Sequence, residues 1–123
     1  YNTGVFTDST LDSIKKELDA AFQAKKAGNE GKMRVCARRA AGIAARNYLQ
    51  NQGIAVINAN AIHCLEQLKD TQIPLTCILR VDKLIQRVDT NFMLPAEIDL
   101  YMEASALVNE LIALDKGDIN GNE

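Results

Sequence analysis

The sequence predicts an all-α protein, an up-and-down helical bundle of four long helices plus one short helix. Two observations support this prediction. Apolar residues recur at helical spacing through most of the chain, and no segment alternates between apolar and polar residues for long. Aromatic residues are also rare, with three Tyr, three Phe and no Trp. A core built from aliphatic and alanine side chains favours close packing of helices over a β-sandwich.

The length of 123 residues is typical of one domain, and such a chain buries roughly two-thirds of its unfolded surface. We expect a single domain over residues 1–123, with flexible ends at 1–8 and 117–123. Hydrophobic residues make up 47% of the chain and charged residues 24%, as in an ordinary soluble protein. No apolar run approaches the ~18–20 residues that cross a bilayer, and no secretory signal is visible. We therefore expect a cytoplasmic protein without membrane contact.

The first two helices have clear start and stop signals. The first is predicted to begin after the N-cap residues at 7–10 and to end at Gly28. The second is predicted from about Glu30 to Gln52, with Gly53 as the glycine that follows a helix end. A tight turn therefore joins two long antiparallel helices.

The other three helices are predicted from turn residues and apolar spacing. A short third helix covers Ala61 to about Lys69, and Pro74 sits at the first turn of a fourth. Pro95 opens the fifth, which continues to about Lys116. This last helix is apolar on two sides, which is typical of a central helix or of an oligomer interface. Its leucines on one side are Leu100, Leu107, Leu111 and Leu114.

The second helix carries an apolar seam inside a rim of arginines. Val35, Gly42 and Leu49 follow one another at seven-residue spacing. Gly42 costs about 1 kcal/mol of helix propensity relative to Ala, so close approach of another backbone is a reasonable compensation. Two interpretations remain open: a seam for self-association, together with the leucines of the fifth helix, or a wide packing face within one chain.

The charges are strongly segregated despite a net charge of −2. Residues 25–46 contain seven basic residues and one acid, whereas residues 89–123 contain eight acids and one lysine. The arginine cluster can bind phosphates bidentately, can pair with the acidic last third of the chain, or can form a plain solvated face. The overall acidity argues against a dedicated nucleic-acid-binding protein. The candidate residues for an anion or nucleotide are Arg34, Arg38, Arg39 and Arg46.

No catalytic, cofactor or metal site is predicted. His63 and Glu66 are three residues apart, but the di-metal bundle signature has the order Glu-x-x-His and occurs twice. Cys36, Cys64 and Cys77 are isolated, without the paired spacing of a zinc site. We expect these cysteines to be buried thiols.

One stretch resembles a known family. It begins at Ala24 and reads A-K-K-A-G-N-E-G-K-M-R-V-C-A-R-R-A-A-G-I-A-A-R-N-Y-L-Q-N-Q-G. This run resembles the first helical hairpin of HEPN domains, which are named for higher eukaryotes and prokaryotes and for suspected nucleotide binding. The segments around Ala61 and from Asp99 to Leu111 resemble the later helices of that family. The resemblance implies an antiparallel helical bundle that is often dimeric.

Some HEPN domains are metal-independent ribonucleases, and others are partner subunits of small nucleotidyltransferases. The ribonucleases carry an Arg followed after four to six residues by a His, near the start of the last long helix. Here the region from Phe92 to Met102 contains neither residue, and no Arg precedes His63 within six residues. The chain departs from the catalytic pattern, so we lean towards a protein that is not an enzyme.

The sequence thus favours a non-catalytic HEPN-like binding or assembly module that forms a homodimer. Its partner would be a nucleotidyltransferase or a toxin–antitoxin type of protein. The alternative is a nucleotide- or RNA-binding protein that uses the arginine cluster.

Overall fold

The computed structural model describes residues 6–86 and 99–116. These residues form five α-helices and no strand, so the predicted all-α class is confirmed for the described part of the chain. The helices are α1 (Asp8–Lys26), α2 (Glu30–Asn51), α3 (Ala61–Leu68), α4 (Leu75–Ile85) and α5 (Leu100–Lys116).

Local signals set the ends of α1 and α2 as expected. The Thr7 side chain accepts a hydrogen bond from the Thr10 backbone N–H at 3.1 Å and so caps the start of α1. Gly28 and Gly53 follow the ends of α1 and α2 with φ of 78° and 77°, a conformation that favours glycine. Asn29 caps α2 by accepting from the Lys32 N–H.

Small residues let α2 occupy the centre of the fold. α2 contacts all four other helices, and two of the three buried residues of its neighbour α1 are the alanines Ala21 and Ala24. Helices with small side chains can approach closely, and this compensates for the scarcity of large core residues. The small buried residues of α2 are Cys36, Ala37, Ala40, Ala41, Gly42, Ala44 and Ala45.

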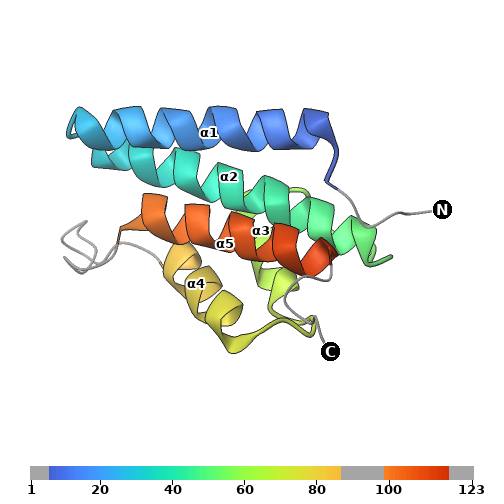
Figure 1. Cartoon of the computed structure of the whole chain (residues 1–123). Coiled ribbons are helices and arrows are strands. Elements are labelled where there is room, and N and C mark those ends of the chain that lie inside the picture. Colours follow the sequence, from blue (N-terminus) through green and yellow to red (C-terminus); the bar gives the residue numbers. More distant parts are fainter. Residues whose placement is uncertain (1–5, 87–98, 117–123) are drawn as a thin grey trace.

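The three long helices lie side by side, with α3 and α4 on the side of α2 and α5 away from α1 (Figure 1). α5 starts near the end of α1, where Lys25 pairs with Asp99, and it ends near the end of α2, where Asn51 donates to Asp115. α2 and α5 therefore run in the same direction. The leucines of α3, α4 and α5 complete the core: Leu65, Leu68, Leu84, Leu100, Leu107 and Leu111.

Two architectural expectations are not confirmed by the described residues. The described part of α4 has only 11 residues and α3 has 8, so the described helices are three long and two short rather than four long and one short. The parallel pair α2 and α5 also departs from a simple up-and-down order. The reason is that α3 and α4 together carry the chain back to the end at which α2 began.

Of the N-terminal end that we expect to be flexible, residues 1–8, the structure describes only residues 6–8. Phe6 is buried in the core, Thr7 caps α1, and Asp8 is its first residue. Residues 1–5, the tail at 117–123 and the predicted helix start at Pro95 lie outside the described residues.

Candidate functional site: the arginine side of helix α2

The seam on α2 is for the most part packed within the chain. A Cβ atom placed on Gly42 would lie 2.6 Å from the Cβ of Ala61 in α3. Leu49 is fully buried, and only Val35 is exposed, at 46%. The close approach inferred for Gly42 is present, but its partner is α3 of the same chain.

The leucines of α5 that we expected at an interface are also packed mostly within the chain. Leu100, Leu107 and Leu111 are fully buried in the core, and Leu114 is half-buried. Residues without exposed surface cannot contact a second chain, so most of the expected interface set is core. Val35 and Leu114 are the two members that keep exposed surface.

Arg38 reaches across from α2 to the end of α4. Its Nε donates to the carbonyl oxygen of Leu84 at 2.5 Å, and its Nη2 donates to that of Gln86 at 2.9 Å. The last carbonyls of a helix lack helical partners and carry partial negative charge, so a guanidinium there is stabilising. Burial lowers the pKa of Arg38, and the neighbouring charge of Arg34 lowers it further.

Arg34 lies beside Arg38 with only a weak acidic partner. Its Nη1 is 3.6 Å from the Glu30 carboxylate, which is exposed, whereas the Arg34 side chain is only 16% exposed. The two arginines line a cleft of about 560 Å³ between α2, α3 and the end of α4. Its other lining residues are Gly31, Val35, Ile62, Ile85 and Gln86.

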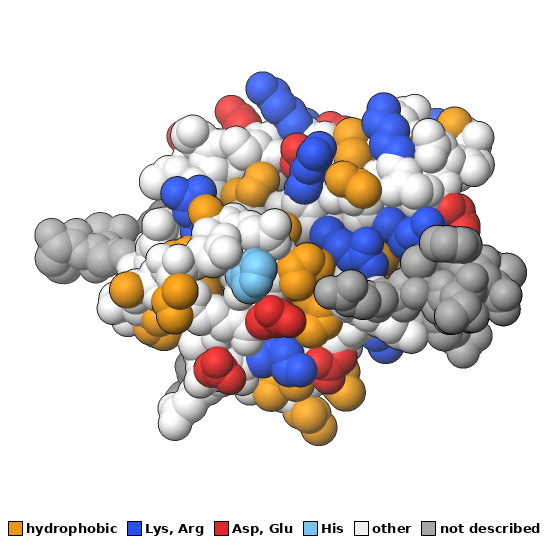
Figure 2. Space-filling model, turned by 180° about the vertical axis from the view of Figure 1, so that it is seen from behind, with side chains coloured by type: hydrophobic (Ala, Val, Ile, Leu, Met, Phe, Trp, Pro, Cys, Tyr) orange, Lys and Arg blue, Asp and Glu red, His pale blue; other side chains and the backbone are white. Residues whose placement is uncertain are grey.

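Arg39 and Arg46 face a different part of the surface. Both are exposed and line a smaller hollow of about 200 Å³ that Glu17 also borders. Within residues 6–86 and 99–116, neither arginine forms an ion pair or a hydrogen bond. The face of the molecule in Figure 2 carries basic side chains interspersed with exposed hydrophobic ones.

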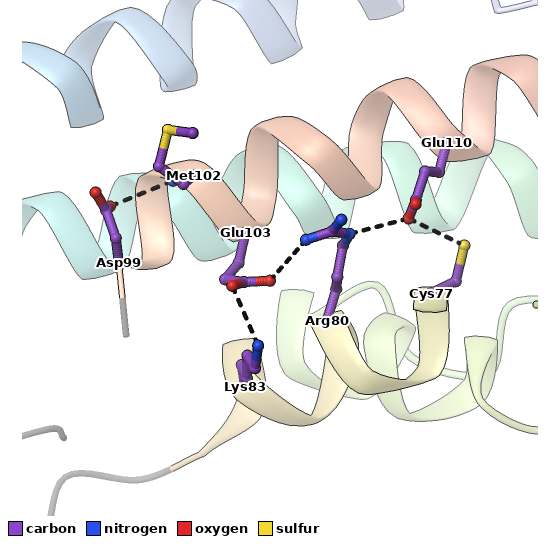
Figure 3. A network of polar contacts seen from close by, with 7 residues as sticks. All are labelled: Cys77, Arg80, Lys83, Asp99, Met102, Glu103 and Glu110. Carbon is purple, nitrogen blue, oxygen red and sulfur yellow. Dashed lines mark hydrogen bonds and ion pairs between the residues drawn. The ribbon is translucent and has the colours of Figure 1, made fainter. Parts of the chain in front are cut away.

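Among the described residues, Glu103 and Glu110 of α5 do not form the pairs with these arginines that one interpretation of the charge segregation predicts. Instead, they pair with α4 (Figure 3). Arg80 contacts Glu103 at 3.0 Å and Glu110 at 3.1 Å, and Lys83 lies 3.4 Å from Glu103. Sequence reasoning missed Arg80 and Lys83 because they lie outside the conspicuous basic stretch.

Cys77 belongs to the same network and is fully buried. Its Sγ lies 3.4 Å from a Glu110 carboxylate oxygen (Figure 3). Burial, followed by the charge of Glu110, raises the pKa of Cys77 to about 12. A thiol that stays protonated at neutral pH is a poor nucleophile. Cys36 and Cys64 are also free and buried.

His63 and Glu66 are both exposed on α3. Among the described residues, no group of three or more His, Cys, Asp or Glu side chains is arranged to hold a metal ion. Nor does any described helix combine the length and hydropathy required to span a membrane.

Comparison with protein-family models yields no match, and neither do comparisons with curated proteins and with solved structures.

Proposed function

We propose that this chain is a non-catalytic helical binding module that takes a phosphate-bearing ligand, a nucleotide or RNA, on its arginine face. We use the name arginine face for two pairs on α2, Arg34 with Arg38 and Arg39 with Arg46, which line separate hollows. The observation that carries the proposal is the absence of acidic partners for Arg39 and Arg46 within the described residues. Some basic residues elsewhere do have such partners, namely Lys25, Lys69, Arg80 and Lys83.

The arrangement suits an extended anion. From Arg34 to Arg46 the helix rises by about 18 Å, since each residue adds ~1.5 Å. Planar guanidinium groups bind phosphate oxygens bidentately, and this favours arginine over lysine at such a surface. Exposed Val35 beside these charges offers a nucleobase or sugar an apolar contact.

The resemblance to HEPN domains supports the same class of ligand and a bundle of that type. Because the ribonuclease Arg–His pair is missing from the sequence, we propose binding without cleavage. A role as the partner subunit of a nucleotidyltransferase is compatible with this assignment. Three buried free cysteines support the cytoplasmic location that we propose.

The test is a titration with labelled single-stranded RNA and with ATP at low and at moderate salt. We expect RNA binding that weakens strongly between about 50 and 200 mM salt, because released counterions drive phosphate binding. The double variant Arg39→Ala/Arg46→Ala should lose most of it. Lys116→Ala removes one exposed charge at the end of α5 and is the matched control. Salt-independent binding, or unchanged binding by the double variant, would refute the proposal.

A second candidate is the assembly module, as a homodimer or with a partner protein. It is favoured by one observation: Leu75 and Leu79 of α4 are 68% and 50% exposed and, one turn apart, lie on the same side of the helix. Exposed apolar patches mark interaction sites. Analytical ultracentrifugation at micromolar concentration should show a dimer that Leu79→Glu dissociates. A wild-type protein that sediments as a monomer would contradict the homodimer.

A further inference from the structure

We infer that the cleft between α2, α3 and the end of α4 binds a small amphipathic anion, a carboxylate or phosphate group joined to a compact hydrocarbon. The inference rests on the proposed function for the anionic group alone. It adds a ligand class for one part of the arginine face, the part that contains Arg34 and Arg38.

The charged end of the cleft is prepared for an anion. The contacts to Leu84 and Gln86 hold the Arg38 guanidinium in place but use only two of its five N–H donors. A side chain that is already ordered loses less entropy when a ligand arrives. Arg34 adds a second guanidinium that is largely shielded from water, and the nearby carboxylate of Glu30 is itself 77% exposed. Two closely spaced positive charges therefore face the cleft with one weak counter-charge.

Three apolar side chains form most of the remaining wall of the cleft. Val35 comes from α2, Ile62 from α3 and Ile85 from the last turn of α4. Val35, which lines the cleft, keeps nearly half of its surface exposed. A ligand with a hydrocarbon group would cover this surface, whereas a bare inorganic anion would leave it in water.

The size of the cleft points to a small molecule. A volume of about 560 Å³ lies within the range of ~300–1,000 Å³ that is usual for small-molecule sites. The hollow beside Arg39 and Arg46 is smaller and is bordered by the acid Glu17. The two pairs of arginines thus have different surroundings, and we assign the amphipathic ligand to the first pair alone.

The test is calorimetric titration of the full chain with octanoate, below its micelle concentration, and with octyl phosphate. Acetate, inorganic phosphate and octanol are the matched probes. We expect each octyl anion to bind at least about tenfold more tightly than either bare anion and than octanol. Equal binding of acetate and octanoate, or of octanol and octanoate, would overturn the inference, because only one end of the cleft would then contribute.

Variants at Val35 locate the site without disturbing the core. Val35→Asp places a negative charge on an exposed position in the cleft and should abolish octanoate binding, whereas Val35→Leu should retain it. Circular dichroism and thermal unfolding check that both variants fold. Octanoate binding by a folded Val35→Asp protein as tight as that of the wild type would exclude this cleft.

Two further measurements distinguish this inference from the proposed function and from binding to a lipid surface. Arg39→Ala/Arg46→Ala should bind octanoate normally although it loses RNA. Loss of octanoate binding by this variant would refute the inference, whereas RNA binding that it retains would refute the proposed function. The same anionic chemistry occurs on lipid surfaces. A lipid surface is thus the other possible source of the anion. Because we assign the cleft to a free small molecule, we expect the protein to remain in the supernatant when vesicles of phosphatidylcholine and phosphatidate are pelleted. Pelleting with these vesicles would overturn the assignment to a free ligand.

Discussion

Gly42 of α2 lies so close to Ala61 of α3 that a side chain at position 42 has no room. A Cβ atom there would lie 2.6 Å from the Cβ and 2.7 Å from the Cα of Ala61. The contact places the start of α3 against the middle of α2. It thereby positions Ile62, the next residue, as a wall of the cleft that also contains Arg34 and Arg38.

We predict that Gly42→Ala destabilises the protein. Alanine gains about 1 kcal/mol of helix propensity, but overpacking against the α3 backbone costs roughly 1–3 kcal/mol and should outweigh it. Urea unfolding measures the difference. Gly31→Ala is the control, because its nearest neighbouring atom would be 3.9 Å away. A Gly42→Ala protein as stable as Gly31→Ala would show that α3 moves freely.

Arg38 should matter for stability as well as for binding. Arg38→Ala removes two hydrogen bonds from a charged donor to the end of α4, and we expect a loss of about 1–3 kcal/mol. Arg39→Ala, which removes an exposed arginine at the next position, should change the unfolding free energy by no more than about 0.5 kcal/mol. Denaturant unfolding of both variants provides the comparison. Equal losses of unfolding free energy would argue against a stabilising contact between Arg38 and the end of α4.

The network between α4 and α5 gives a third prediction. Arg80→Ala leaves the carboxylates of Glu103 and Glu110, which are only 14% and 25% exposed, without their shared partner, and should cost about 1–3 kcal/mol. Lys69→Ala breaks a more exposed pair with Asp82 and should cost ~0–1 kcal/mol. Thermal unfolding distinguishes the two variants. We expect Arg80→Ala to have the lower melting temperature, and the reverse order would contradict this prediction.

The buried thiol of Cys77 should make the unfolding free energy fall at alkaline pH. Its pKa rises from 9.0 for a free thiol to about 12 in the folded chain. Between these values the unfolded chain loses the thiol proton while the folded chain keeps it, so the stabilising contribution is complete below pH 9 and falls as the pH rises. Cys77→Ala should show a shallower decline in unfolding free energy over that interval. An identical slope for both proteins would assign the decline to other groups.

The elements of this fold were readable from short stretches of sequence because their signals are local. Thr7, Gly28 and Gly53 act on residues within one turn, and apolar spacing along a single helix suffices to indicate a helical class. The arginine cluster was visible for the same reason. Its division into two differently surrounded pairs was not, since Ile62 and Ile85, which line the cleft of Arg34 and Arg38, belong to other helices.

Local signals and long-range contacts thus contributed different parts of this protein. Helix ends, helical class and the position of the arginines follow from interactions between near neighbours, which the order of residues specifies directly. The partner of Gly42, the carbonyls that hold Arg38 and the pairing of Glu103 with Arg80 depend on which helices meet and in which register. That choice is made by burial of the whole core, where many weak apolar contacts act together, and so it appears only in the folded chain.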